Sequence, residues 1–306
     1  MEIVMQTALS GLELASRDDV HDIYVLPQEK QLVVYTDRMA VSGQALDNPV
    51  PYRGVMFSQI SLYWMNKFTH LVGNNLVAQA VERFPQGFQA HAAQLKGRSV
   101  IAQKLRLLPM TFRVIGNLIG AEWQAYKETR IVGGKSLPKG LREGDRIENP
   151  IMIVLPSAEI LNRGVDDPTK WAQRMFGPML FKNLEDICLS IYGVARGYAG
   201  RRGIVIADTH FEFGVHEGTP YIIGDVMTPE TSTYWSADTL TPGQPQAGMD
   251  RKPLLDWLAA EGWESPQPLP EVPQEVIAET SKRCRAIFDV MTGKIPLPEQ
   301  EDQAAV

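Results

Sequence analysis

The segment from residue 203 to residue 235 places the strongest constraint on the fold of this chain. It contains two short apolar runs, residues 203–207 (GIVIA) and 220–224 (PYIIG), and a polar stretch, residues 216–219 (HEGT), separates them. Runs of this length with branched side chains are typical of buried strands, and the polar stretch has the composition of a hairpin connection. We therefore expect an antiparallel strand pair in this segment.

Acidic residues stand at the polar end of each predicted strand. Asp208 and Glu212 follow the first apolar run, and Asp225 follows the second. Residues that flank a hairpin connection face one another at short range, and crowded carboxylates repel unless a cation such as Mg2+, usually carrying phosphate, lies among them. The alternative is that Asp208 caps a turn, Glu212 faces solvent and Asp225 only ends a strand, because isolated acids are common near turns.

Length and charge limit the class of protein. A chain of 306 residues with 44% hydrophobic residues is long enough for two core-bearing lobes. Its net charge of −6 argues against a nucleic acid or an anionic membrane surface as the main partner. Residues 1–20 lack the basic start and apolar core of a secretion signal, and no apolar run approaches the about 18 residues of a membrane span. We expect a cytoplasmic protein with a small-molecule substrate, and a homo-oligomer is left open.

The two cysteines and five histidines do not form a metal-binding pattern. Cys188 and Cys284 each lie in a half-apolar segment with helical spacing, which favours buried free thiols over a disulfide or a metal site. The histidines show neither HxxxH nor HExxH spacing, so zinc is not expected.

Periodicity predicts strands and helices in two groups. The predicted strands are 20–26, 31–35, 96–108 and 111–118, and the predicted helices are 55–71, 167–197, 252–261 and 274–291. This order indicates an α+β protein with antiparallel sheets on either side of a central cleft. We expect an N-terminal β-rich lobe (1–113), a C-terminal α+β lobe (114–292) and a disordered tail (293–306).

Several motifs in order carry a family resemblance. They are Thr36-Asp37-Arg38, residues 59–64 (QISLYW), residues 137–141 (LPKGL), residues 207–214 (ADTHFEFG), Thr228-Pro229 and Asp256-Trp257-Leu258. On these motifs the chain resembles the SAICAR synthetase family over roughly residues 18–290. The resemblance implies a two-lobed, ATP-grasp-like fold and an ATP-dependent ligase of purine synthesis that joins aspartate to a carboxylated aminoimidazole ribotide.

The implied reaction phosphorylates a carboxylate with Mg-ATP, after which an amine displaces the phosphate and forms an amide. Such chemistry depends on position and on neutralisation of phosphate charge. The resemblance places the metal on Glu212 and on an acid after the second strand, which reads Asp225 here. It places nucleotide contacts on a lysine pair, of which Lys104 is retained.

Other cationic positions of the family differ in this chain. A basic stretch reads 18–21 (DDVH), and three lysines read Gln103, Ser157 and His210. Each lost charge removes roughly 1 to 3 kcal/mol of charge-assisted bonding. The resemblance implies ATP and Mg2+ as cofactors, but the lost charges predict that ATP binds weakly.

The family's contacts to the ribotide differ as well. Its two arginines, its serine and its aspartate align with Ile115, Thr233, Ala121 and Gly43. An apolar Ile115 cannot neutralise a phosphate dianion, and an unpaired dianion in a cleft is costly. These changes predict that the ordinary ribotide is not the substrate.

Five further residues are candidates for substrate binding. Asp37 and Arg38 survive together, and Arg38 can clamp a carboxylate with two bonds or form only a surface fork. Glu122 places a new acid on the turn beside Ala121, where the family has its serine, and the alternative is an exposed helix-start glutamate. Ser232 and Arg251 lie where the family binds its acidic co-substrate.

Four residues are candidates for catalysis: Asp208, His210, Glu212 and Asp225. His210 stands between two acids, so it can act as a base with a raised pKa, unless strand alternation points it away from both.

Three hypotheses for function follow. The first is a divergent ligase that forms amide (C–N) bonds on a small carboxylate or amide in specialised metabolism. The alternative is a repurposed member that no longer uses ATP. The second alternative is an authentic purine-pathway SAICAR synthetase with compensating residues from other segments.

Overall fold

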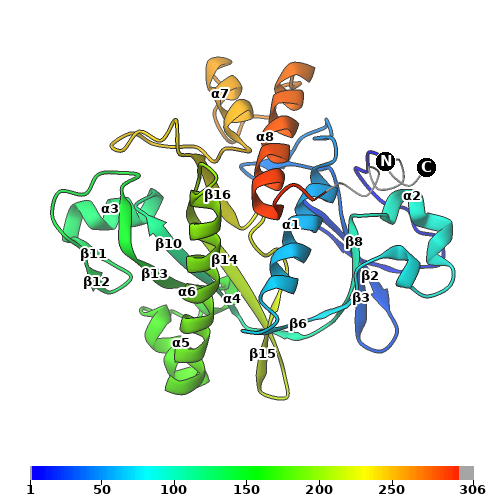
Figure 1. The fold of residues 1–306 in the computed structure, drawn as a ribbon, viewed down its shortest axis with the longest axis horizontal. Coiled ribbons are helices and arrows are strands. Elements are labelled where there is room, and N and C mark those ends of the chain that lie inside the picture. The colour runs from blue at the N-terminus through cyan, green and yellow to red at the C-terminus, as the bar shows by residue number, and fades with distance from the viewer. Residues whose placement is uncertain (1, 296–306) are drawn as a thin grey trace. The chain divides into compact units, whose positions relative to one another are not determined.

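Strands with alternating burial build two main sheets, one in each of two units of the chain (Figure 1). The computed structural model describes residues 2–295. Unit 1 contains Met1–Asn66, Asn75–Leu105 and Met249–Val306, and unit 2 contains Lys67–Asn74 and Arg106–Gly248. The division into lobes 1–113 and 114–292 stays a prediction, and residues 296–306 of the predicted tail lie outside the described residues. The predicted α+β class with antiparallel sheets is confirmed.

The sheet of unit 1 has five antiparallel strands in the order β1-β2-β3-β8-β7. Their bounds are β1 Leu14–Arg17, β2 His21–Leu26, β3 Lys30–Tyr35, β7 Leu76–Ala78 and β8 Ser99–Gln103. The predicted pair at 20–26 and 31–35 is confirmed by β2 and β3. Gln28 and Glu29 between them both have positive φ (62° and 53°), as a tight hairpin turn requires.

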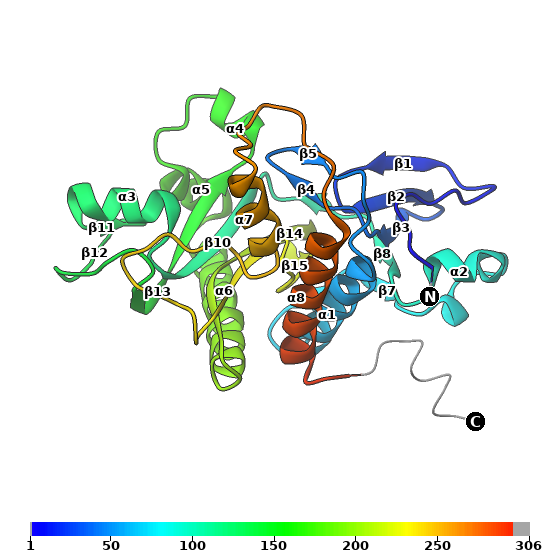
Figure 2. The ribbon, with the colours of Figure 1, turned by 90° about the horizontal axis from the view of Figure 1, so that it is seen from above.

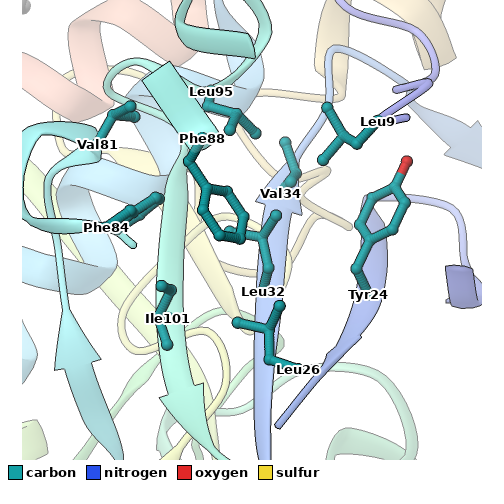
Figure 3. Packing of buried hydrophobic residues seen from close by; sticks show 10 residues of the cluster. All are labelled: Leu9, Tyr24, Leu26, Leu32, Val34, Val81, Phe84, Phe88, Leu95 and Ile101. Atoms are coloured by element: carbon teal, nitrogen blue, oxygen red, sulfur yellow. The ribbon is translucent and has the colours of Figure 1, made fainter. Parts of the chain in front are cut away.

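One face of this sheet carries the core of unit 1. Leu32 and Val34 alternate along β3 and are fully buried. Figure 3 shows them packed against neighbouring strands and the segment that follows β7. The cluster consists of Leu9, Tyr24, Leu26, Leu32, Val34, Val81, Phe84, Phe88, Leu95 and Ile101.

The remaining elements of unit 1 are mostly helical. They are β4 Ala40–Val41, β5 Gln44–Ala45, α1 Arg53–Lys67, the 3-10 turns Val81–Arg83 and Phe88–His91, α2 Ala92–Leu95, α7 Lys252–Ala260 and α8 Gln274–Thr292. Helices α1 and α8 lie side by side (Figure 2), and Ser281 Oγ of α8 donates a hydrogen bond to the carbonyl of Pro51. Cys284 of α8 is a buried free thiol, as predicted, and so is Cys188 of unit 2.

The sheet of unit 2 has seven strands with β14 at its centre. Its main order is β13-β10-β14-β15-β6, and β16 and β9 also pair with β14. The bounds are β6 Gly73–Asn74, β9 Arg106–Leu107, β10 Met110–Asn117, β13 Arg146–Pro156, β14 Ile204–His216, β15 Thr219–Ile223 and β16 Ser232–Ser236. The predicted hairpin is confirmed, with Glu217 and Gly218 as its turn.

The first strand of that hairpin is longer than the sequence predicts. Strand β14 has 13 residues, so Asp208 and Glu212 lie within it and do not follow it. The reason is that Thr209, Phe211 and Phe213 continue the buried alternation beyond residue 207. The polar residues between them occupy the other face of the same strand.

The helices of unit 2 cover part of this sheet. They are α3 Gly120–Thr129, α4 Ala158–Asn162, α5 Pro168–Phe176 and α6 Pro178–Gly200, and β11 Ile131–Val132 pairs with β12 Lys135–Ser136. Helix α6 runs along β14 (Figure 1). The helix predicted over 167–197 is divided at Gly177, whose φ of 77° and following proline interrupt it. No helix among residues 2–295 combines the length and apolarity needed to cross a membrane.

Candidate active site

Three predicted residues share one face of β14. Asp208, His210 and Glu212 are spaced two apart along the strand, so their side chains project to the same side. On the neighbouring strand β10, Ile115 pairs with Asp208 and Arg113 pairs with His210. The alternative that His210 points away from both acids is therefore wrong.

Arg113 links two of the predicted acids. Its Nε donates to Asp208 Oδ2 at 2.6 Å, and its Nη1 lies 2.8 Å from Glu122 Oε2 as an ion pair without aligned hydrogen-bond geometry. The side chains of Arg113, Asp208 and Glu122 are 14%, 7% and 10% exposed, so solvent screens these charges less than at the surface. Glu122 is thus not the exposed helix-start glutamate of the alternative interpretation.

His210 is a neutral neighbour of this cluster. Its Nε2 lies 3.8 Å from Asp208 Oδ2, and its side chain is 36% exposed. Burial lowers the pKa of His210 below its ordinary value, and Arg113 adds to this, although Asp208 and Glu122 oppose it. The predicted raised pKa is wrong because desolvation of the imidazolium outweighs the attraction of the two acids.

Glu212 and Asp225 lie where β14 and β15 meet. Glu212 is exposed and pairs with Ile223, the last residue of β15, and Asp225 follows two residues later. A Cβ added at Gly224 would lie 3.5 Å from Glu212 Oε2, so the backbone before Asp225 passes beside that carboxylate. Among residues 2–295 no group of three or more His, Cys, Asp and Glu could hold a metal. Two carboxylates do fit Mg2+ that takes its remaining ligands from phosphate and water.

Two strand irregularities flank the pair of Ile115 and Asp208. The pairing of β14 with β16 shifts between Ile206 and Asp208, and the pairing of β10 with β13 shifts between Ile115 and Asn117. Such irregularities bend strands and redirect side chains, and they are common beside active sites.

A hydrogen bond joins helix α6 to strand β14 next to this pair. Tyr192 Oη donates to the carbonyl of Ile206 at 2.6 Å. A Cβ at Gly116 would lie 1.8 Å from that hydroxyl oxygen, so this position needs glycine.

Ser232 lies on the opposite face of the sheet. It pairs with Thr209, and the two hydroxyl oxygens lie 2.7 Å apart in the interior. The structure therefore does not bring Ser232 to Asp208 and Glu212, and its substrate-binding role stays a prediction.

Asp37 and Arg38 are engaged inside unit 1. Asp37 is fully buried, and its carboxylate accepts bonds from Arg98 Nη1 at 2.9 Å and from the amides of Val4 and Gly54 at 2.8 and 3.0 Å. Arg38 Nη2 donates to two backbone carbonyls, and its Nη1 lies 2.9 Å from Asp22 Oδ1. These contacts hold the N-terminal segment to the sheet, and substrate binding by either residue stays a prediction.

The last two candidates also belong to unit 1. Lys104 is exposed just after β8, and its amide donates to the carbonyl of Glu29 at 2.7 Å. Arg251 precedes α7 and donates from Nη1 to the carbonyl of Ala40 at 2.7 Å. Their roles stay predictions.

Arg113 was not among the residues predicted from the sequence. Its signal is a single charge inside the run 110–115 (MTFRVI). In a strand of a mostly buried sheet, such a charge needs a partner. The sequence could have indicated that partners exist, but their identity depends on the register of β10 against β14.

Comparison with known proteins decides the family. The sequence model of SAICAR synthetase matches residues 16–270. The chain belongs to the SAICAR synthetase family. Because SAICAR synthetases are ligases, the chain belongs to a family of enzymes.

Individual members of the family match this chain over nearly their whole length. Phosphoribosylaminoimidazole-succinocarboxamide synthase of Pelobacter propionicus is 38% identical over 95% of this chain and 98% of its own. The protein of the same name from Maridesulfovibrio salexigens is 35% identical over 94% and 97%. A solved SAICAR synthase matches with a TM-score of 0.85 at 27% identity, covering 95% of this chain and 98% of that one. The Saccharomyces cerevisiae SAICAR synthase solved in complex with SAICAR matches with a TM-score of 0.83. The two-lobed, ATP-grasp-like fold class is confirmed by this match.

These relatives overturn the first functional hypothesis. The expectation of a divergent ligase in specialised metabolism is contradicted by identities of 34–38% over nearly full length to proteins named for SAICAR synthesis. That expectation compared charges one sequence position at a time. It read each replaced charge as a change of substrate, although relatives named for SAICAR synthesis themselves differ from this chain at most aligned positions.

Proposed function

We propose that this protein is a phosphoribosylaminoimidazole-succinocarboxamide synthase of purine synthesis. It joins the amine of aspartate to the carboxylate of a carboxylated aminoimidazole ribotide, with ATP hydrolysis as the driving reaction. The observation that carries the proposal is the identity of 34–38% across 94–96% of the chain and 97–99% of its relatives. The competing outcome is that the protein shares this sequence similarity but acts on a substrate of another class.

The residues of the β14 face support this reaction. Glu212 and Asp225 would hold Mg2+ together with phosphate oxygens. When bound, Mg-ATP supplies the phosphoryl group that activates the substrate carboxylate. Asp208, held by Arg113, offers a fixed negative charge on the same strand face as Glu212. The neutral His210 next to Asp208 can accept or donate a hydrogen bond.

The same proposal covers partners and location. The partners are the small-molecule substrates, ATP and Mg2+, and the protein works in the cytoplasm, where the nucleotide precursors are made. Neither nucleic acid nor a membrane is needed for this reaction, and homo-oligomerisation stays a prediction.

Complementation tests the function in a living cell. The gene, expressed in a purine auxotroph that lacks this synthase, should restore growth without added purine. Glu212→Ala should abolish growth because it removes a metal ligand, and Glu148→Ala, an exposed glutamate of the same sheet, should not. Failure of the wild-type protein to support growth, although it accumulates in soluble form, would contradict the proposal.

A further inference from the structure

One oxygen of a buried carboxylate in the β14 face lacks a hydrogen bond. Asp208 is 5% exposed, and its Oδ2 accepts from Arg113 Nε. Its Oδ1 is buried and makes no hydrogen bond with any residue from 2 to 295. Buried polar atoms are rarely left unpaired, so an unsatisfied one indicates a partner that comes from outside the chain.

The other oxygen is held by Arg113, and Glu122 holds Arg113 in turn. Arg113 projects from β10, and Glu122 projects from the first turn of α3 toward the same guanidinium. A planar guanidinium that meets one carboxylate through Nε and another through Nη1 has little rotational freedom. Glu122 therefore restrains Arg113, and Arg113 restrains Asp208.

The charge of the cluster selects the kind of ligand. One arginine and two carboxylates leave one net negative charge, and the positive charge of Arg113 is already directed at both acids. A phosphate or carboxylate placed against Asp208 Oδ1 would meet like charge in a poorly solvated site. A hydrogen-bond donor would instead satisfy the free oxygen.

We propose that Glu122 and Arg113 form a positioning clamp that presents Asp208 Oδ1 to a neutral or cationic hydrogen-bond donor of a substrate, an amine or a hydroxyl group. This inference rests on the proposed synthase function and names the chemistry that one part of its site accepts. The donor has two sources in that reaction, namely the amine of aspartate and the N–H or O–H groups of the ribotide. Glu122 and Arg113 do not touch the substrate and act only through Asp208.

Steady-state kinetics with each substrate varied in turn tests the clamp. In Asp208→Asn the amide oxygen stays with Arg113, because an NH2 group cannot accept, and a donor replaces Oδ1. KM for the substrate that supplies the donor should rise about 10- to 100-fold, while KM for the other substrate changes less than twofold. The substrate whose KM rises identifies the source of the donor. If that substrate is aspartate, an unchanged inhibition constant of succinate, which is aspartate without its amine, assigns the donor to the amine.

The clamp residues should act as one unit. Glu122→Gln should raise the same KM by about three- to tenfold, and this effect should vanish in an Arg113→Gln background, since coupled residues are not additive. Arg113→Lys should raise this KM less than Arg113→Gln does, because lysine keeps the positive charge. It should not restore the wild-type KM, because an ammonium group cannot meet both acids as a planar fork. The matched control is Glu128→Gln, an exposed glutamate on the same helix, and it should leave both KM values unchanged. Melting temperatures of all variants should be measured alongside.

The outcomes distinguish the clamp from the function. If the wild-type enzyme turns over, two results would overturn the clamp and leave the synthase function standing. The effects of Glu122→Gln and Arg113→Gln on KM could be additive, or both variants could lower only the melting temperature. An equal rise of both KM values in Asp208→Asn would also overturn it. Absence of wild-type turnover would overturn the synthase function and, with it, the inference that rests on it.

Discussion

The buried ion pair of unit 1 allows a quantitative stability prediction. Arg98 and Asp37 are both fully buried, and Arg98 Nη1 donates to Asp37 Oδ2 at 2.9 Å. Arg98→Met keeps much of the side-chain length but leaves the Asp37 carboxylate in the interior without its cation. Removing one partner of a buried pair destabilises by about 3 to 5 kcal/mol, because the remaining charge cannot be hydrated. At about 2 to 4 °C per kcal/mol for a unit of 150–250 residues, the melting temperature should fall by roughly 10 °C.

Thermal unfolding followed by circular dichroism and calorimetry measures this effect. The control is Arg83→Met, an exposed arginine of the same unit, which should change the melting temperature by less than about 2 °C. Adding Asp37→Asn to Arg98→Met should recover part of the loss, because the double variant contains no buried charge at this site. If the melting temperature of Arg98→Met fell by less than 2 °C, the reasoning would be refuted. An intact melting temperature with a raised substrate KM in Asp37→Asn would indicate the predicted substrate role instead.

Three further predictions concern packing, pH and ligand binding. Gly116→Ala should destabilise by about 1 to 3 kcal/mol because its Cβ would overlap the buried Tyr192 hydroxyl, whereas Gly193→Ala in α6, with no atom within 4 Å of the added Cβ, should be neutral or stabilising in urea unfolding. Burial raises the pKa of Asp18, but the hydrogen bonds and charge of His21 outweigh it and bring the pKa to about 2. Because this folded pKa is depressed, Asp18 contributes stability fully above its ordinary pKa of 3.8 and loses it as the pH falls toward 2; melting temperatures at pH 5 and pH 2.5 should differ less in Asp18→Asn, and an unchanged difference would contradict this account. Mg-ATP at several millimolar should raise the melting temperature if it binds more tightly than about 1 mM, and chelation of Mg2+ should remove the increase; no increase would argue against nucleotide binding.

Local pattern predicted much of the fold. The strands at 20–26 and 31–35, the hairpin around Gly218 and the helix over 274–291 were expected from periodicity and turn composition, and the structure confirms them. Strand β13 was missed, because its residues 148–150 (ENP) interrupt the apolar pattern. The length of β14 was underestimated, because only its alternate residues are apolar after Ala207.

The site was predictable only in part. The acids on one strand, Asp208 and Glu212, share a face because of strand alternation, which a sequence can indicate. The contact of Arg113 with Asp208 and Glu122 depends on the register between two strands and on the entry of α3, which no local pattern specifies. The wrong functional hypothesis has another cause: it read each replaced charge as a lost contact, although relatives named for SAICAR synthesis differ from this chain at most aligned positions.

Turnover by the purified protein tests the central claim most directly. The protein is incubated with the carboxylated aminoimidazole ribotide, aspartate and Mg-ATP, and the succinocarboxamide product, ADP and phosphate are quantified together. The account predicts equal amounts of all three, with none formed when ATP, Mg2+ or aspartate is left out. A folded protein that forms no succinocarboxamide under these conditions, or forms it without consuming ATP, would contradict it.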